Sequence, residues 1–252
     1  MKAEPAAHPE GPPGVLPPAS LAAPVWVVAP HPDDESLGCG GLLAALSDLG
    51  VPTWALLLSD GAASHPGSPG WAGSRLVRRR LFEWHAALDL LGLPPERRVA
   101  LGLPDGRLPL PGQPNGQRAV SAIRAALARA APATVLLPWR RDPHPDHRAA
   151  HALMEQALGS WPSARRLEYA VWLPERGVAD DRPRPGEALG WEVPLAGAAG
   201  RKEAAIRVHR SQLGLLIHDD PGGFVLPEEM IRRALVGPER LYEVLLAGGG
   251  SR

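Results

Sequence analysis

Short apolar runs alternate with longer amphipathic runs through the middle of the chain. The short runs have the length of buried strands, and they lie at Val25–Ala29, Thr53–Leu58, Val99–Leu103 and Thr134–Leu137. Each is followed by a run with helical periodicity, at Glu35–Leu49, Arg75–Leu91, Gln117–Ala131 and His147–Leu158. The repeated strand–helix order predicts an α/β fold with a mostly parallel central sheet and helices on both faces.

The remaining segments break this rhythm. Residues 1–24 are rich in proline and alanine, and we expect a leader that is disordered or loosely docked, followed by one domain over residues 25–252. Residues 61–74 are rich in Gly, Ser and Pro, which suits a mobile loop beside an active site. The pattern further predicts strands at Leu167–Leu173 and Trp191–Leu195, then one helix and a less regular end after Arg201.

Composition excludes several classes of protein. The chain has 27 basic and 27 acidic residues, whereas a dedicated nucleic-acid-binding protein normally carries a basic surplus. A single cysteine, Cys39, allows no internal disulfide. No run approaches the roughly 18 apolar residues of a membrane span. We therefore expect a cytoplasmic protein with a small-molecule partner, while the oligomeric state stays open.

Four ionisable residues lie within five positions directly after the first predicted strand, in the run Pro30-His31-Pro32-Asp33-Asp34-Glu35. Helix capping explains one or two of the carboxylates. It does not explain a histidine held between two prolines. Because open parallel sheets bind ligands at the carboxyl ends of their strands, this run is a candidate metal-binding motif.

A second motif, His144-Pro145-Asp146-His147, follows the fourth predicted strand in the same way. Catalytic zinc is typically held by three His, Asp or Glu side chains, with a fourth position open for water. The two motifs together supply three histidines and three aspartates. They predict a divalent-metal centre, with Zn²⁺ as the first choice and Fe²⁺ also compatible with two histidines and one aspartate.

Together these motifs resemble the LmbE-like, or PIG-L, family of N-acetylglucosaminyl deacetylases. The run from Ala29 to Glu35 is similar to the family's signature, and the segment from His144 to His147 is similar to its second motif. Weaker similarities occur in the family's order at residues 38–41, 59–61, 80–83, 91–92, 103–108 and 209–212. The resemblance covers about residues 25–246 and implies a single Rossmann-like domain.

The resemblance implies a role for each residue that matches a motif position. His31, Asp34 and His147 would be the zinc ligands. Asp33 would be the general base, and His144 would stabilise the transition state.

Three further residues would act around this centre by the same resemblance. Asp146 would orient and charge-pair one of the neighbouring histidines, and Arg80 and Asp105 would contact the sugar. The family often has an acid where this chain has Ala62, which puts that part of the substrate fit in doubt.

The implied reaction is hydrolysis of an N-acetyl or other N-acyl group on an amino sugar or glycoside, with release of acetate and a free amine. Zinc would activate water and polarise the amide carbonyl. Asp33 adjoins a ligand and can take the proton of the attacking water. The sequence leaves open whether Asp33 or His144 then protonates the leaving amine.

Three other functions compete with this interpretation. A nucleotide-binding module needs a glycine-rich first turn, but here that turn carries three carboxylates that would repel phosphate. A metal-dependent amidase or esterase acting on a non-sugar acyl substrate could use the same site, because specificity resides in the loops. A metal-binding protein without catalysis leaves Asp33 and His144 without a purpose.

Overall fold

The central feature of the computed structural model, which describes residues 13–195 and 197–245, is an eight-stranded sheet with the order β1-β7-β8-β6-β5-β2-β3-β4. The strands are β1 (Gly14–Val15), β2 (Val25–Ala29), β3 (Thr53–Ser59), β4 (Arg98–Leu103), β5 (Thr134–Pro138), β6 (Arg165–Tyr169), β7 (Ala188–Val193) and β8 (Glu239–Val244). All neighbours pair in parallel except β6 with β8 and β7 with β8. The predicted, mostly parallel sheet is confirmed.

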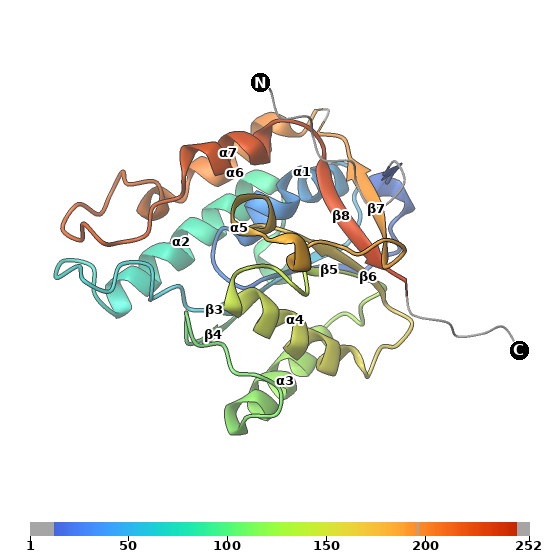
Figure 1. The fold of residues 1–252 in the computed structure, drawn as a ribbon, viewed down its shortest axis with the longest axis horizontal. Helices are drawn as coiled ribbons and strands as arrows, with labels where there is room; N and C mark the ends of the chain where they lie inside the picture. The colour runs from blue at the N-terminus through green and yellow to red at the C-terminus, as the bar shows by residue number, and fades with distance from the viewer. Residues whose placement is uncertain (1–12, 196, 246–252) are drawn as a thin grey trace, which may run out of the picture.

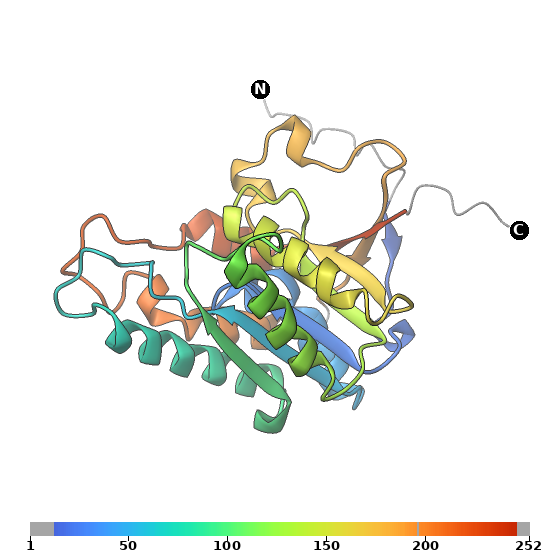
Figure 2. The ribbon, with the colours of Figure 1, turned by 90° about the horizontal axis from the view of Figure 1, so that it is seen from below.

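Helices cover both faces of the sheet, as predicted (Figure 1). They are α1 (Asp34–Asp48), α2 (Ser74–Leu91), α3 (Pro114–Leu127), α4 (Pro145–Leu158), α5 (Leu173–Arg176), α6 (Ala199–Arg207) and α7 (Glu228–Leu235). Helices α1, α2, α6 and α7 pack together over one face, and α3 and α4 pack as a pair over the other (Figure 2).

Strand β2 shows why the sheet lies between two cores. Its side chains alternate between faces: Val25, Val27 and Ala29 enter the core beneath α1, whereas Trp26 and Val28 enter the core beneath α3 and α4. All five are at most 1% exposed. A strand that is covered on both faces reads as a continuous apolar run, which is the pattern the sequence shows.

The strand order places a topological switch point between β2 and β5. From β2 the chain builds outward through β3 to β4 on one side, and from β5 to β6 on the other. Parallel sheets of this kind bind ligands in the crevice at the carboxyl ends of the two strands that flank such a point. The segments that leave β2 and β5 carry the two predicted metal motifs.

The start of the chain contributes to the core. Residues 1–12 of the expected leader lie outside the described residues, whereas residues 13–24 include a short strand and two buried leucines. Strand β1 pairs in parallel with β7, and Leu16 and Leu21 are buried in the core beneath α1. The apolar core therefore begins before the predicted boundary at residue 25.

The C-terminal third corrects two expectations. The strand predicted at Leu167–Leu173 ends at Tyr169, because the chain turns at Val171 and Trp172, whose amides donate to the Asp142 carboxylate at 3.1 and 3.0 Å. The end that was expected to be less regular contains β8, which pairs with both β6 and β7.

In the middle of the chain, α3 ends at Leu127, four residues earlier than predicted. Within the described residues, no helix combines the length and apolar character needed to cross a membrane.

Candidate active site at the carboxyl ends of the parallel strands

Both predicted metal motifs lie at the same edge of the sheet. The segment from Pro30 to Asp33 links β2 to α1, and the segment from Trp139 to His144 links β5 to α4. Nitrogen atoms of His31, His144 and His147 form a group in which all members lie within 4.8 Å of one another. The expectation that the motifs converge is confirmed.

His31 is surrounded by carboxylates. Its Nδ1 lies 3.1 Å from Asp34 Oδ2, and its Nε2 lies 3.1 Å from both Asp105 Oδ1 and Asp146 Oδ2. Asp146 also accepts hydrogen bonds from the amides of Gly106 and Leu108, which join the second motif to the loop after β4. His31 is thus held at both ring nitrogens, with one of them turned to Asp34.

His147 approaches the same aspartate from the opposite motif. Its Nε2 lies 3.2 Å from Asp34 Oδ2, and its Nδ1 lies 3.4 Å from Asp142 Oδ1. The side chain is fully buried, yet neither ring nitrogen has a hydrogen-bond partner of acceptable geometry. Buried polar groups are normally paired. Asp34 Oδ2 therefore lies between two imidazole nitrogens, one of which lacks a hydrogen bond.

Asp33 occupies an uncommon backbone conformation, with φ 142° and ψ −24°. Such a conformation costs free energy in a residue with a side chain, and it persists where the surrounding structure imposes it. Here the Arg80 guanidinium imposes it, because Nη2 donates to Pro32 O and to Asp33 Oδ2, at 3.1 and 3.2 Å, and Nη1 donates to Gly61 O. Arg80 is itself buried, so it is not part of a solvated basic face.

His144 is the N-cap of α4. Its Nδ1 accepts a hydrogen bond of 3.2 Å from the Asp146 amide, and its ring centroid lies 4.8 Å from that of His31 and 6.2 Å from that of Trp172. The cap commits Nδ1 as an acceptor. When the ring is neutral, the proton therefore resides on Nε2.

The burial of these groups strongly perturbs their protonation. Burial raises the pKa of Asp33 to about 7, although the Arg80 charge acts in the opposite direction. Burial also disfavours the charged form of His147, but Asp34 and Asp142 outweigh it and raise the pKa to about 9. Burial, assisted by His147 and His31, lowers the pKa of His144 to about 4. The cluster thus favours positive charge between the two motifs and a neutral His144.

A pocket of about 240 Å³ opens above the cluster. Six of the eight predicted site residues line it: His31, Asp33, Asp34, Arg80, Asp105 and His144. Asp146 and His147 do not line it; both are buried and contact His31 and Asp34, respectively. The structure therefore brings all eight predicted residues together around one pocket.

A family model described as PIG-L, GlcNAc-PI de-N-acetylase, matches residues 26–158, which is more than half of the chain and includes both motifs. The chain belongs to the PIG-L family. Within this family it is an N-deacetylase, a hydrolase that cleaves an amide bond.

Two relatives and one solved structure agree with this family assignment. Diacetylchitobiose deacetylase from Thermococcus kodakarensis is 29% identical over 193 residues, which cover 75% of this chain and 69% of that protein. 1D-myo-inositol 2-acetamido-2-deoxy-alpha-D-glucopyranoside deacetylase from Nakamurella multipartita is 29% identical over 91% of each chain. The structure of the conserved protein TT1542 from Thermus thermophilus matches with a TM-score of 0.62 and 26% identity, over 90% of this chain and 98% of that one.

Some residues of this PIG-L site were not predicted. Asp142 contacts His147 and fixes the turn at residues 171–172, and Trp172, Gln212 and Phe224 line the pocket. Gln212 belongs to a stretch that resembles the family, so the sequence contained a signal for it. The aromatic residues come from segments with no motif. The sequence alone could not have shown that they face the pocket.

Proposed function

We propose that this chain removes an N-acetyl or other N-acyl group from a small amino sugar or glycoside in a zinc-dependent hydrolysis. The observation that carries the proposal is the position of Asp34 Oδ2, which is 3.1 Å from His31 Nδ1 and 3.2 Å from His147 Nε2 at the base of a 240 Å³ pocket. The pocket gives a small acylated molecule access to this cluster.

The three donors fit a divalent metal ion. Ligand atoms that are each about 2 Å from one tetrahedral zinc ion lie somewhat more than 3 Å apart, which is the distance of Asp34 Oδ2 from each of the two histidine nitrogens. The unpaired Nε2 of buried His147 gains a partner when a metal is bound. The second nitrogen of His31 contacts Asp146 and Asp105, and His147 Nδ1 faces Asp142, as expected for carboxylates that orient metal-binding histidines. Fe²⁺ fits the same donors.

When bound, the metal ion lowers the pKa of its coordinated water and polarises the acyl carbonyl. Asp33 lines the pocket beside Asp34, and its carboxylate accepts the proton of the attacking water. A general base is most effective when its pKa is near the working pH, and burial raises the pKa of Asp33 to about 7. The Arg80 guanidinium keeps the carboxylate in place.

His144 stabilises the negative charge that develops on the carbonyl oxygen. Because its Nδ1 accepts the Asp146 amide, a neutral ring presents an N–H at Nε2, and a preorganised donor of this kind lowers the barrier without being charged. The low pKa of His144 supports this neutral form over a protonated imidazole, and it makes Asp33 the better candidate to protonate the departing amine.

Arg80 and Asp105 line the pocket and are proposed to bind the sugar. Each also has a structural partner: Arg80 binds Asp33, and Asp105 Oδ2 accepts the Ala63 amide at 2.8 Å. Trp172 and Phe224, whose ring centroids are 5.8 Å apart, supply an apolar wall. The names of the two relatives both specify acetylated sugars, which supports a sugar over a non-sugar acyl substrate.

A panel of N-acetylated glycosides, scored by release of the free amine and of acetate, tests the proposal. The matched control is the same enzyme stripped of metal with a chelator and then reloaded with Zn²⁺ or Fe²⁺. We expect activity to disappear on stripping and to return on reloading. Hydrolysis of simple acyl amides or esters without any turnover of acetylated sugars would favour the amidase or esterase alternative.

A cytoplasmic location stays a prediction from the sequence.

A further inference from the structure

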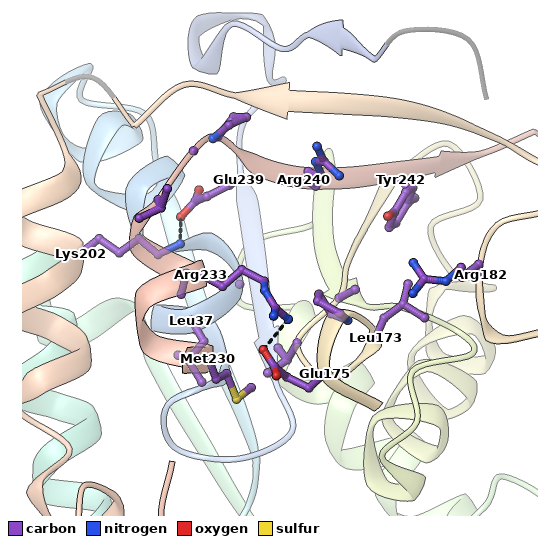
Figure 3. A pocket seen from close by; sticks show the side chains of 18 of the residues that line it. Leu37, Leu173, Glu175, Arg182, Lys202, Met230, Arg233, Glu239, Arg240 and Tyr242 are labelled. Carbon is purple, nitrogen blue, oxygen red and sulfur yellow. Dashed lines mark hydrogen bonds and ion pairs between the residues drawn. The ribbon is translucent and has the colours of Figure 1, made fainter. Parts of the chain in front are cut away.

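A second cavity of about 430 Å³ lies beside the proposed catalytic pocket and is larger than it (Figure 3). It is enclosed by the first turns of α1, the turn between β6 and α5, helix α7 and the start of β8. Leu37 and Val171 line both cavities, so these two side chains form the wall between them. Nothing in the proposed deacetylase chemistry uses this space.

The carboxylates of the second cavity already have partners. Glu239 Oε1 accepts from Lys202 Nζ and from the Gly41 amide, both at 2.6 Å, and Oε2 accepts from the Leu42 amide. Glu175 Oε1 accepts from Arg233 Nη1 at 2.6 Å, across the cavity from α7 (Figure 3). Neither carboxylate therefore offers an unpaired negative charge to a ligand.

The basic residues outnumber these acids. Four basic side chains and two glutamates line the cavity, so its lining carries two net positive charges. The basic residues are Arg182, Lys202, Arg233 and Arg240. Arg240 contacts Glu192, which lies outside the cavity, at 3.4 Å, and among the described residues the Arg182 guanidinium has no acidic partner. Guanidinium groups bind phosphate and carboxylate groups through paired, charge-assisted hydrogen bonds.

An apolar surface completes the cavity. Leu37, Leu173 and Met230 line it, with Leu37 and Met230 beside the Glu175–Arg233 pair and Leu173 toward Arg182 (Figure 3). We propose that the second cavity binds the phosphate or carboxylate group of a small molecule whose body rests on this apolar surface. The anionic group can belong to an extended deacetylase substrate, a source that rests on the proposed function, or to a separate small molecule.

Calorimetric titration with phenyl phosphate, and with benzyl alcohol as the neutral control, tests the site directly. The double variant Arg182→Ala/Arg240→Ala should weaken phenyl phosphate binding at least tenfold. Glu175→Gln removes the nearer of the two carboxylates that contact Arg233, the other being Glu229 at 3.5 Å, and should tighten binding several-fold. Arg232→Ala is the matched control, because Arg232 lies on the same helix but pairs with Glu229 and does not line the cavity; it should leave binding unchanged.

Three results would overturn the proposal: no binding of phenyl phosphate, equal binding by the double variant, or loss of binding when the protein is stripped of metal, since the last would place the anion at the catalytic centre. This titration does not depend on deacetylase activity, so it stands if the proposed function fails.

Kinetics then distinguish the two sources of the anion. If the anion is part of the substrate, the double variant should raise KM for N-acetylglucosamine 1-phosphate but not for N-acetylglucosamine, and phenyl phosphate should compete with the former. If it belongs to a separate molecule, KM for both sugars should stay unchanged while phenyl phosphate binding still falls.

Discussion

The charged side chains that line the two cavities of this protein differ in how deeply they are buried. In the catalytic pocket, charged groups from the segments that follow β2, β4 and β5 and from α2 are buried and hold one another, as in the pair of Arg80 and Asp33, whose side chains are only 4% and 8% exposed. In the second cavity, the side chains of Arg233 and Arg240 are 41% and 50% exposed. Buried networks are strong and costly to break, whereas exposed pairs are screened by solvent. The first arrangement suits chemistry at fixed positions, and the second suits adjustable recognition.

The comparison predicts that the most severe losses come from the buried cluster. His147→Ala should abolish both metal binding and acetate release, because it removes a proposed ligand that no neighbour replaces. Metal content by mass spectrometry, measured beside acetate release, checks this. His151→Ala is the control on the same helix, since His151 faces Glu168 rather than the cluster. A His147→Ala enzyme that keeps a full complement of zinc would show that the ligand set is wrong.

Asp33→Asn separates chemistry from metal binding. It removes the proposed base but not a ligand, so zinc content should match the wild type while kcat falls by about 10²–10⁴-fold, the usual contribution of a general base. Steady-state turnover at saturating substrate gives this value. Loss of zinc from Asp33→Asn would instead make Asp33 a ligand.

Arg80→Ala and Asp105→Ala test the substrate side of the same pocket. Losing a hydrogen bond to a charged group costs about 1.5–3 kcal/mol, so kcat/KM should fall roughly ten- to a hundredfold with zinc retained. Because Arg80 also holds Asp33, its loss should lower kcat, whereas that of Asp105 should act mainly on KM. Arg78→Ala, an exposed neighbour on α2, is the control. Wild-type kcat/KM in both variants would remove them from the site.

The sequence predicted the region around the catalytic pocket better than the second cavity for a physical reason. Strands β2 and β5 are covered on both faces, so their apolar runs stand out, and the polar motifs after them mark the sheet edge. Strand β8, with the sequence Glu-Arg-Leu-Tyr-Glu-Val, carries charges that make it resemble a surface segment. Leu16 and Leu21 lie among prolines, so no periodic pattern marks them as core residues, although both are buried in the core beneath α1.

Asp142 is a residue that local patterns could not assign, and it gives the smallest expected effect on activity. Its Oδ2 accepts the amides of Val171 and Trp172, almost thirty residues ahead, while its Oδ1 accepts the His144 amide and faces His147 Nδ1. Its role depends on a turn that exists only in the folded protein. It connects the catalytic cluster to the wall that both cavities share, because Val171 belongs to that wall.

Asp142→Asn can keep the oxygen that holds the turn at Val171 and Trp172, but its amide nitrogen replaces Oδ1, which removes both the negative charge that faces His147 and the acceptor of the His144 amide. Loss of a partner that orients a metal ligand typically weakens metal affinity about ten- to a hundredfold. Zinc affinity by competition with a chelator should fall by that factor, while activity at saturating zinc stays within a few-fold of wild type. Asp142→Ala should in addition lower thermal stability, since two buried amides and one partly buried amide lose their acceptor. If Asp142→Asn binds zinc as tightly as the wild type, packing alone orients His147, and the buried network contributes less to the metal centre than the comparison of the two cavities implies.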